Sequence, residues 1–405
     1  MKLCVLCVSA VNVVELKVEQ VELSSEDALR LNVLIANAQA IRIDENSMTV
    51  YGLNGEQEMK FPLSPTGRRD QYLQAVRSML SAMVLDSPGG YPVFLRRWTR
   101  MGQIDNDQLD RLLKLGEPEA VMAVVCARNL SDELARRAWW CAPYAEHARR
   151  MLESPRVVAG SMGKVLADYL IEHLPFETEP RDMLNTVRLV LQGDLIDAAQ
   201  QQKLWESGAR QKTYRIGFLE TLPDTLPEQQ PARAELSEIA DVLASLNDNP
   251  YALHLRKLLD APGQSFLAVA LDVLLNPADQ EVASALFNAL GRHGMALRQV
   301  NGQRELAEID ALIEALITRD SALQALLTAL PQMQAEIRSM LRLAHVSEYL
   351  LNPIFGQTDA VGTLMQEKIE PVTLPLAHDI ACLRGQDPQA LQTGRRRARG
   401  AGRRR

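Results

Sequence analysis

The chain has 405 residues, of which 47% are hydrophobic, 5% aromatic and 23% charged, and its formal net charge is −7. This length exceeds one comfortable hydrophobic core, so we expect several domains or a long helical stack. No stretch approaches eighteen uninterrupted apolar residues, which argues against a transmembrane helix. The five cysteines are odd in number and scattered. A disulfide framework is therefore excluded, and a reducing cytoplasm is the expected location.

The first twenty residues allow three interpretations. The mostly apolar run 3–14 is compatible with a short secretory signal, although only one lysine precedes it where such signals carry their positive charge. Cys4 and Cys7 have the spacing of redox and metal sites but lack a second pair or a nearby histidine. We favour a third interpretation, in which translation starts at Val21 and residues 1–20 are a mis-called extension. An intact-mass measurement that finds them in the purified protein would contradict it.

Residues 21–102 are expected to form a small α+β region. A helix is predicted over 24–37, with Ser24 or Ser25 as its N-cap and acidic residues in its first turn. The period then changes to two, which predicts three short strands joined as a β-meander, at 40–44, 48–53 and 56–63. The dipeptide at 54–55 is Asn-Gly, typical of a hairpin turn. A helix over 68–85 follows.

The rest of the chain shows helical periodicity. A first helical domain is expected over 103–221, with helices at about 105–115, 117–127, 131–140, 142–153 and 160–174. The proline-rich segment 222–231 is the expected linker to a second helical domain over 232–385. Asn-Pro pairs at 249, 276 and 352 each close one helix and open another. The fold class is therefore mainly α: a multi-helical stack, either α-solenoid-like or an irregular bundle, with a small N-terminal β-meander.

No residues with the pattern of a catalytic, cofactor-binding or metal site stand out. The segment 160–164 (GSMGK) lacks the first glycine and the final hydroxyl of a phosphate-binding loop. The six histidines show no helical ligand pair, and His173 with its acidic neighbours is better explained as a solvated loop. Cys126 is expected in the apolar core, whereas Cys141, near arginines, is a candidate for a lowered thiol pKa. We accordingly predict no cofactor and no enzyme activity.

The most unusual surface candidate combines arginine with tryptophan. It consists of two segments, with the candidate residues Arg96, Arg97, Trp98, Arg136, Arg137, Trp139 and Trp140. Both residue types are enriched in interface hot spots and in stacking sites for bases. The competing interpretation is that the tryptophans fill a helical core while the arginines cover them or pair with Asp132, Glu133 and Glu146.

The C-terminus, 386–405, is expected to be a disordered, arginine-rich tail. Its candidate anion-binding residues are Arg395, Arg396, Arg397, Arg399, Arg403, Arg404 and Arg405. Subtracting these seven positive charges from the net charge leaves a body at −14, which should repel nucleic acid. Only the tail could therefore hold an anionic partner, and a solvated end without a specific partner is the simpler interpretation.

Five segments together resemble one family, the sulfur reduction protein DsrS, which is encoded with the reverse-acting dissimilatory sulfite reductase of sulfur-oxidising bacteria. They are 23–32 (LSSEDALRLN), 64–73 (SPTGRRDQYL), 87–102 (SPGGYPVFLRRWTRMG), 133–140 (ELARRAWW) and 174–183 (LPFETEPRDM). The resemblance extends from about residue 21 to about residue 385. It implies a cytoplasmic protein that accompanies sulfur oxidation in a regulatory or supporting capacity, and it supplies no catalytic residues.

Three functional hypotheses follow from these observations. The first is a non-catalytic accessory or regulatory protein that contacts another protein of the sulfur-oxidation machinery. The second is a nucleic-acid-binding regulator that uses the arginine tail, with an affinity that falls steeply with salt. The third is a sulfur carrier that uses the thiol of Cys126 or Cys141. We favour the first.

Overall fold

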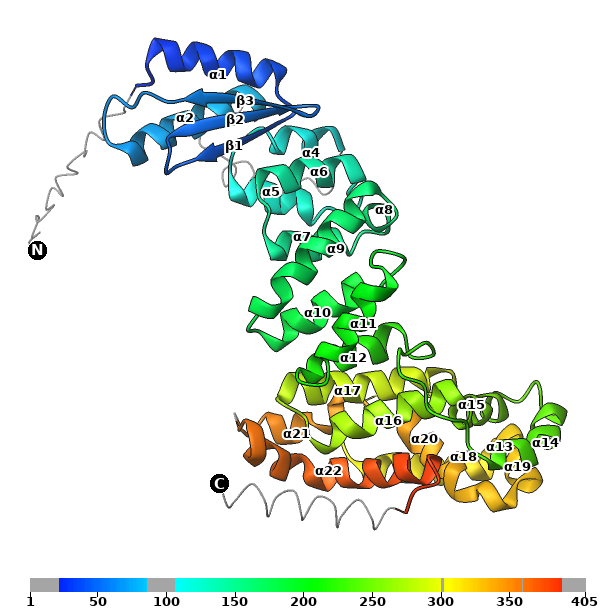
Figure 1. Ribbon diagram of the computed structural model, residues 1–405. Helices are drawn as coiled ribbons and strands as arrows, with labels where there is room; N and C mark the ends of the chain where they lie inside the picture. The colour runs from blue at the N-terminus through cyan, green and yellow to red at the C-terminus, as the bar shows by residue number, and fades with distance from the viewer. Residues whose placement is uncertain (1–21, 86–105, 300–301, 359, 388–405) are drawn as a thin grey trace, which may run out of the picture. The chain divides into compact units, whose positions relative to one another are not determined.

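The computed structural model describes residues 22–85, 106–299, 302–358 and 360–387 (Figure 1). Helices make up 67% of the described residues, and the strands form one small antiparallel sheet near the N-terminus. The predicted fold class, mainly α with an N-terminal β-meander, is confirmed. Among the described residues, no single helix is long and apolar enough to cross a bilayer. The helices α15 (Pro250–Leu259) and α16 (Ala261–Leu275) reach that length and composition only together, and they are bent by 72°.

Backbone contacts divide the chain into two compact units, Met1–Met162 and Gly163–Arg405. The division falls inside helix α9 (Ser161–His173). The segment 222–231, expected as an interdomain linker, has no helix but lies inside the second unit. There it is anchored by the buried side chain of Leu226 and by the Gln230 amide, which donates to Ser265 Oγ at 2.7 Å.

The first unit begins with an α+β region whose elements match the predicted ones closely. They are α1 (Ser25–Asn37), β1 (Ala40–Asp44), β2 (Thr49–Asn54), β3 (Gln57–Pro62) and α2 (Arg69–Leu85). Ser24 caps α1 as expected, because its side chain accepts a hydrogen bond from the Asp27 amide at 3.1 Å. Gly55 has a φ of 60°, the left-handed conformation that the hairpin turn requires.

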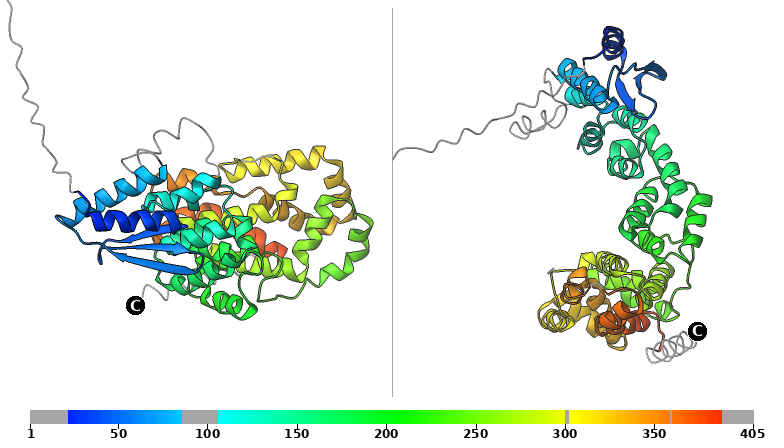
Figure 2. Two further views of the ribbon diagram at one scale, coloured as in Figure 1. Left: turned by 90° about the horizontal axis from the view of Figure 1, so that it is seen from above. Right: turned by 90° about the vertical axis from the view of Figure 1, so that its left-hand side faces the viewer.

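The sheet has the strand order β1-β2-β3, with both pairs antiparallel. Helices α1 and α2 lie on the same side of the strands (Figure 2). Leu34 of α1 and Tyr72 of α2 are buried there with Ile41 and Val50 of the sheet. Gly52 of β2 permits the close approach of α1, because a Cβ at this position would lie 2.3 Å from Leu34 Cδ1. The period-two alternation therefore places one apolar face against the helices.

Short helices complete the first unit. They are α4 (Asn106–Leu112), α5 (Pro118–Val125), α6 (Asp132–Cys141), α7 (Ala145–Met151) and α8 (Pro155–Val158), followed by the start of α9. Pro118 and Pro155 occupy the first helical positions, as expected from their missing amide donors. Helices of this length are marginal alone, so each buries an apolar stripe against its neighbours.

In its described residues, the second unit contains helices and no strand. After α9 it contains α10 (Pro180–Val190), α11 (Ala198–Ser207), α12 (Lys212–Thr221), α13 (Glu235–Glu238), α14 (Ala240–Ser245), α15 (Pro250–Leu259), α16 (Ala261–Leu275), α17 (Gln280–His293), α18 (Leu306–Arg319), α19 (Ser321–Ala329), α20 (Gln334–Ala344), α21 (Asn352–Phe355) and α22 (Gly362–Leu383). Asn249 caps α15 by accepting from two backbone amides, as its Asn-Pro pair suggested. Helix α22 packs against both α16 and α20, and Phe266 of α16 is fully buried.

Two arginines, the buried Arg233 and the half-buried Arg342, tie α22 to the rest of the second unit. The Arg233 side chain is only 8% exposed; it pairs with Glu336 of α20 and donates to the Cys382 carbonyl at the end of α22. Arg342 of α20 bridges Asp310 of α18 and Asp379 of α22, at 2.6 and 3.0 Å. Each buried charge therefore has an opposite charge or a carbonyl as its partner, as low-dielectric surroundings require.

The start of α9 explains why the GSMGK segment cannot act as a phosphate loop. Asp132 of α6 accepts hydrogen bonds from the amides of Ser161 and Met162, both at 3.0 Å. Its carboxylate therefore occupies the position at the helix N-terminus that an anion would take. Gly160 makes this approach possible, since a Cβ there would lie 2.1 Å from Asp132 Oδ1.

We expect Gly160→Ala to displace Asp132 and to lower the free energy of unfolding by about 1–2 kcal/mol, the worth of the lost cap. Urea denaturation of the wild type, Gly160→Ala, Asp132→Ala and the double variant measures this. The methyl group should cost clearly less when Asp132 is already alanine. Equal costs in both backgrounds would contradict the explanation.

Candidate interaction surface

Helix α6 carries four of the seven residues of the predicted arginine–tryptophan surface. Ser131 starts the helix by accepting a hydrogen bond from the Leu134 amide at 3.2 Å. Leu134 and Ala138 are buried, whereas Trp139 and Trp140 are half-buried. The helix packs against strand β1.

Both arginines of α6 are held by carboxylates. Arg136 makes two hydrogen bonds to Glu133, at 2.7 and 2.8 Å, and donates to the Gly55 carbonyl of the hairpin turn. Arg137 pairs with Glu133 and with Asp110, both at 2.8 Å. The hydrogen bonds from Arg136 and Arg137 lower the pKa of Glu133 to about 2. Glu133 belongs to α6 itself, so the bond from Arg136 to the Gly55 carbonyl and the pair of Arg137 with Asp110 are the contacts that join these guanidinium groups to neighbouring elements.

Trp140 belongs to an arrangement that reasoning on the sequence missed. Its Nε1 donates to Glu58 of β3 at 3.0 Å, and the same carboxylate oxygen accepts from Arg42 of β1 at 2.9 Å. The Arg42 guanidinium carbon lies 4.8 Å from the ring centres of both Trp140 and Tyr51. The Tyr51 ring has a second cation beside it, because Lys60 Nζ lies 5.7 Å from its centre.

Lys60, Tyr51, Arg42 and Trp140 thus form a row in which cations and rings alternate, and we call it the ladder. The strand register explains it: Arg42 pairs with Tyr51, and Tyr51 with Lys60, so the three side chains share the sheet face opposite α1 and α2. Period-two alternation over 40–62 could have indicated their common face. Only the tertiary packing of α6 adds Trp140.

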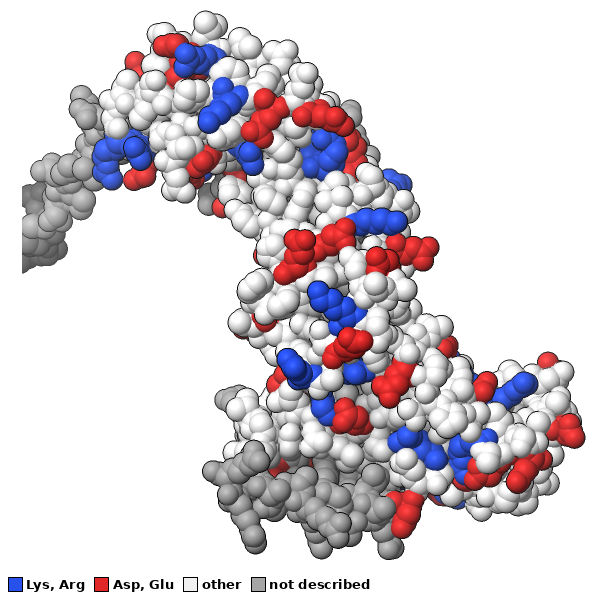
Figure 3. Space-filling view, viewed as in Figure 1, with Lys and Arg blue, Asp and Glu red and all other residues white. Residues whose placement is uncertain are grey.

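The ladder is close to electrically balanced. The side chains of Arg42 and Glu58 are 37% and 40% exposed, and Lys60 is exposed. Glu58, Glu133 and Asp110 offset most of the positive charge of the arginines and Lys60. Lysine, arginine and acidic side chains are interspersed over the described part of the first unit on the face shown in Figure 3. The ladder therefore offers rings and paired charges to a partner, with little net field.

The remaining predicted surface residues lie outside the described residues. They are Arg96, Arg97 and Trp98, and all seven arginines of the tail from Arg395 to Arg405. Within α6, Glu133 pairs with arginine as the competing core interpretation proposed, but Asp132 caps α9 instead. The two tryptophans of α6 are neither fully buried nor fully exposed.

The two cysteines that we considered as sulfur carriers have environments opposite to those expected. Cys126 is exposed, although it follows an apolar run, because α5 ends at Val125. Burial raises the pKa of the Cys141 thiol to about 12, against our expectation of a lowered value. A thiol protonated at neutral pH is a poor nucleophile.

His173, the histidine with acidic neighbours in the sequence, is exposed. Its ring stacks on Tyr169 with ring centres 3.9 Å apart.

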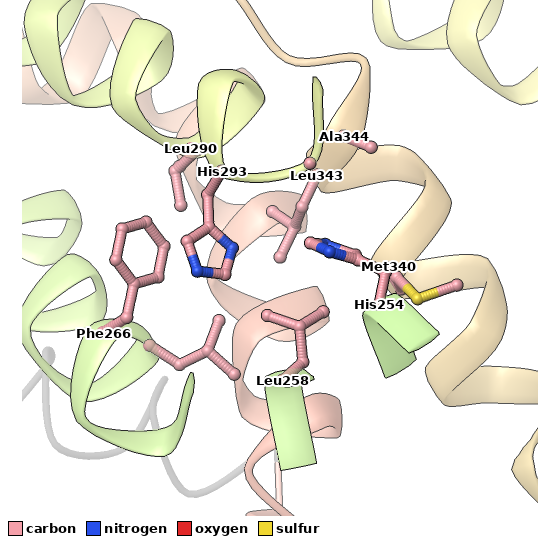
Figure 4. Close-up of a pocket in the computed structure, with 10 residues that line it drawn as sticks. His254, Leu258, Phe266, Leu290, His293, Met340, Leu343 and Ala344 are labelled. Atoms are coloured by element: carbon pink, nitrogen blue, oxygen red, sulfur yellow. The ribbon is translucent and has the colours of Figure 1, made fainter. Parts of the chain in front are cut away.

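A second constellation, which the sequence did not suggest, lies in the second unit (Figure 4). His254 of α15 and His293 of α17 line a cavity of about 10 Å³, with ring centres 5.4 Å apart. Phe266 stacks on His293 at 4.1 Å. The cavity has room for about one water molecule. Among the described residues, no group of three or more His, Cys, Asp or Glu side chains is arranged to hold a metal ion.

Both imidazoles are neutral at pH 7. Burial lowers the pKa of His254 to about 3 and also lowers the pKa of His293. His293 Nε2 lies 3.7 Å from Asp224 Oδ1, too far for a hydrogen bond. A histidine with so low a pKa is a weak general base near neutrality. This pair is therefore better suited to packing than to proton transfer.

Comparison with known proteins gives no further assignment: no family model, no curated protein and no solved structure matches the chain.

We expect Trp140→Phe to lower the free energy of unfolding by about 0.5–1.5 kcal/mol, because it removes the hydrogen bond to Glu58 while keeping a ring beside Arg42. Tyr51→Phe is the matched control, since it keeps the ring between Arg42 and Lys60. Urea denaturation should show a loss for Trp140→Phe that clearly exceeds the loss for Tyr51→Phe. Equal losses would contradict the role given to the indole hydrogen bond.

His254 should make stability depend on pH. Its folded-state pKa of about 3 lies below the ordinary value of 6.5, so the unfolded chain binds the proton more tightly. Stability is therefore lost as pH falls from the ordinary value toward the folded one. Between about pH 7 and about pH 5, the wild type should lose about 2 kcal/mol more than His254→Leu. Parallel pH profiles from urea denaturation would contradict this.

Proposed function

We propose that this chain is a non-catalytic accessory or regulatory protein that binds another protein through the ladder surface of its first unit. The observation that carries the proposal is the ladder itself: two rings and two cations, half-buried or exposed, on a sheet and a helix. Tryptophan, tyrosine and arginine are the residues most enriched in binding hot spots.

Preorganisation supports the same proposal. Trp140, Arg42 and Glu58 fix one another through hydrogen bonds of 3.0 and 2.9 Å, so their side chains are already ordered before a partner arrives. Ordering rotamer-rich side chains is one of the main costs of association, and a rigid surface avoids much of it. The near balance of charge on the ladder favours a protein partner over a nucleic acid, which would require an excess of cations.

The resemblance of five segments to the DsrS family supports a specific metabolic context for the partner, the oxidation of sulfur. One of them, 133–140, supplies Trp140 and the arginines that hold α6 in place. We therefore propose that the partner belongs to the cytoplasmic machinery of sulfur oxidation.

Co-purification tests the proposal. The tagged wild type, Lys60→Glu and Arg69→Glu are each recovered from the organism that encodes the chain and compared by quantitative mass spectrometry. Lys60 stands at the end of the ladder, whereas Arg69 is an exposed residue of α2, on the other side of the sheet. Both substitutions change the charge equally. A partner enriched by the wild type should be reduced about tenfold or more by Lys60→Glu and retained by Arg69→Glu.

Two outcomes would reject the proposal. Equal recovery of every partner by the two variants would exclude the ladder as the binding surface. Recovery that disappears when residues 395–405 are deleted, or after nuclease treatment, would assign binding to the arginine tail and to nucleic acid.

A further inference from the structure

The two edges of the sheet differ. The outer edge of β1 is covered, because the Ile41 amide donates to the Leu113 carbonyl at 2.8 Å after α4. Strand β3 forms the other edge (Figure 1) and, among the described residues, pairs with β2 alone. An edge strand presents a row of backbone donors and acceptors to any strand that can lie beside it.

The register of the sheet identifies the outward backbone groups of β3. The Leu63 amide donates to the Met48 carbonyl at 2.8 Å, and these two residues lie opposite each other in the continued β2–β3 register. In antiparallel strands, hydrogen-bonded pairs alternate with pairs whose amides and carbonyls point away from each other. The amides and carbonyls of Glu58 and Lys60 therefore point away from the sheet. Pro62, the next residue of this set, has no amide to donate.

Glu58 and Lys60 also have unpaired charged groups on the ladder face. The bonds from Arg42 and Trp140 both go to Glu58 Oε2, so Oε1 has no hydrogen bond among the described residues. Lys60 lies beside the Tyr51 ring, and it has no ion pair within the part of the chain that the structure describes. Strand β3 thus offers one carboxylate oxygen and one ammonium group to side chains on an adjacent strand.

A second copy of β3 matches these groups in one antiparallel register. Outward-pointing residues must face each other across such a pair, which allows two-fold registers centred on Glu58, on Met59 or on Lys60. A centre at Glu58 or at Lys60 places two like charges directly opposite each other, which is destabilising. The centre at Met59 instead places Glu58 of each copy opposite Lys60 of the other. Charge therefore selects this register.

We propose that two copies of this chain form a two-fold dimer in which their β3 strands pair antiparallel about Met59, so that the two sheets become one. The Glu58 and Lys60 amides of each copy donate to the Lys60 and Glu58 carbonyls of the other. Each facing Glu58 and Lys60 also form an ion pair on the ladder face. On the core face, the half-buried Met59 contacts its equivalent. The same patch serves both copies, so the assembly closes at two.

The dimer is expected to be weak. Each β3 strand has six residues. Two such strands bury less than the roughly 1,000 Å² typical of stable complexes, so we expect half-dissociation at about 100 μM protein. Cross-linking across the two-fold axis can trap such a dimer.

Disulfide trapping tests the register in a chain that carries Cys4→Ser, Cys7→Ser and Cys126→Ser. Met59→Cys then places two thiols across the axis, where facing Cα atoms are about 4.5 Å apart, within disulfide reach. Gln57→Cys is the matched control on the same face and is more exposed. Its Cα atoms would lie about 14 Å apart, four residues along the strand. Oxidation with diamide should link Met59→Cys at least about tenfold faster than Gln57→Cys.

Sedimentation equilibrium of the unmodified chain is the second measurement and does not depend on the cysteine variants. The average mass should rise with protein concentration. Lys60→Glu turns both cross-strand attractions into repulsions, so it should raise the dissociation constant about tenfold or more. Arg69→Glu, which makes the same charge change on α2, should leave the constant unchanged.

Three results would overturn the proposal. A wild-type chain that stays monomeric up to about 500 μM would exclude the dimer. Linking of Gln57→Cys as fast as Met59→Cys would exclude the register centred on Met59. Equal self-association of Lys60→Glu and Arg69→Glu would exclude β3 as the contact. All three are measured on the purified chain alone, whereas the proposed function is tested by recovery of a partner from an extract, so each can fail without the other.

Discussion

The architecture of this protein depends on the burial of apolar stripes by helices that are too short to be stable alone. Most helices of the first unit after α2 have ten residues or fewer, and isolated helices of that length are marginal in water. Each of these helices must therefore pack against neighbouring elements to be stable. The sheet follows the same constraint, because α1 and α2 cover its apolar face and α6 closes part of the other.

Polar contacts then fix how these helices are oriented. Asp132 joins α6 to the start of α9, Asn249 caps α15, and Arg233 satisfies carbonyl groups at the end of α22. A helix end leaves several backbone groups without intrahelical partners, and a buried end needs specific partners for them. Polar side chains that could otherwise bind an ion, such as Asp132 and Arg233, are thus already bound to helix ends within the protein.

Paired polar side chains also hold the ladder in place. The arginines of α6 drew attention as free cations, yet Glu133 and Asp110 hold them, and they leave the nearby rings as the distinctive feature. Trp140 is held in place by Glu58 and Arg42, residues about eighty to one hundred positions earlier in the chain. A surface built in this way is rigid and almost neutral, and such a surface favours shape and ring contacts over long-range attraction.

The sequence by itself determined the local structure of the described residues. Hydrophobic period, N-caps, prolines at first helical positions and the Asn-Gly turn placed α1, the three strands and the short helices within a few residues, because these signals act between near neighbours. Only the tertiary structure decided which side chains meet. It exposed Cys126, left Cys141 half-buried, brought His254 to His293, and set Trp140 against Arg42. Such contacts join residues far apart in the chain, and their geometry depends on packing between elements, which no local pattern encodes.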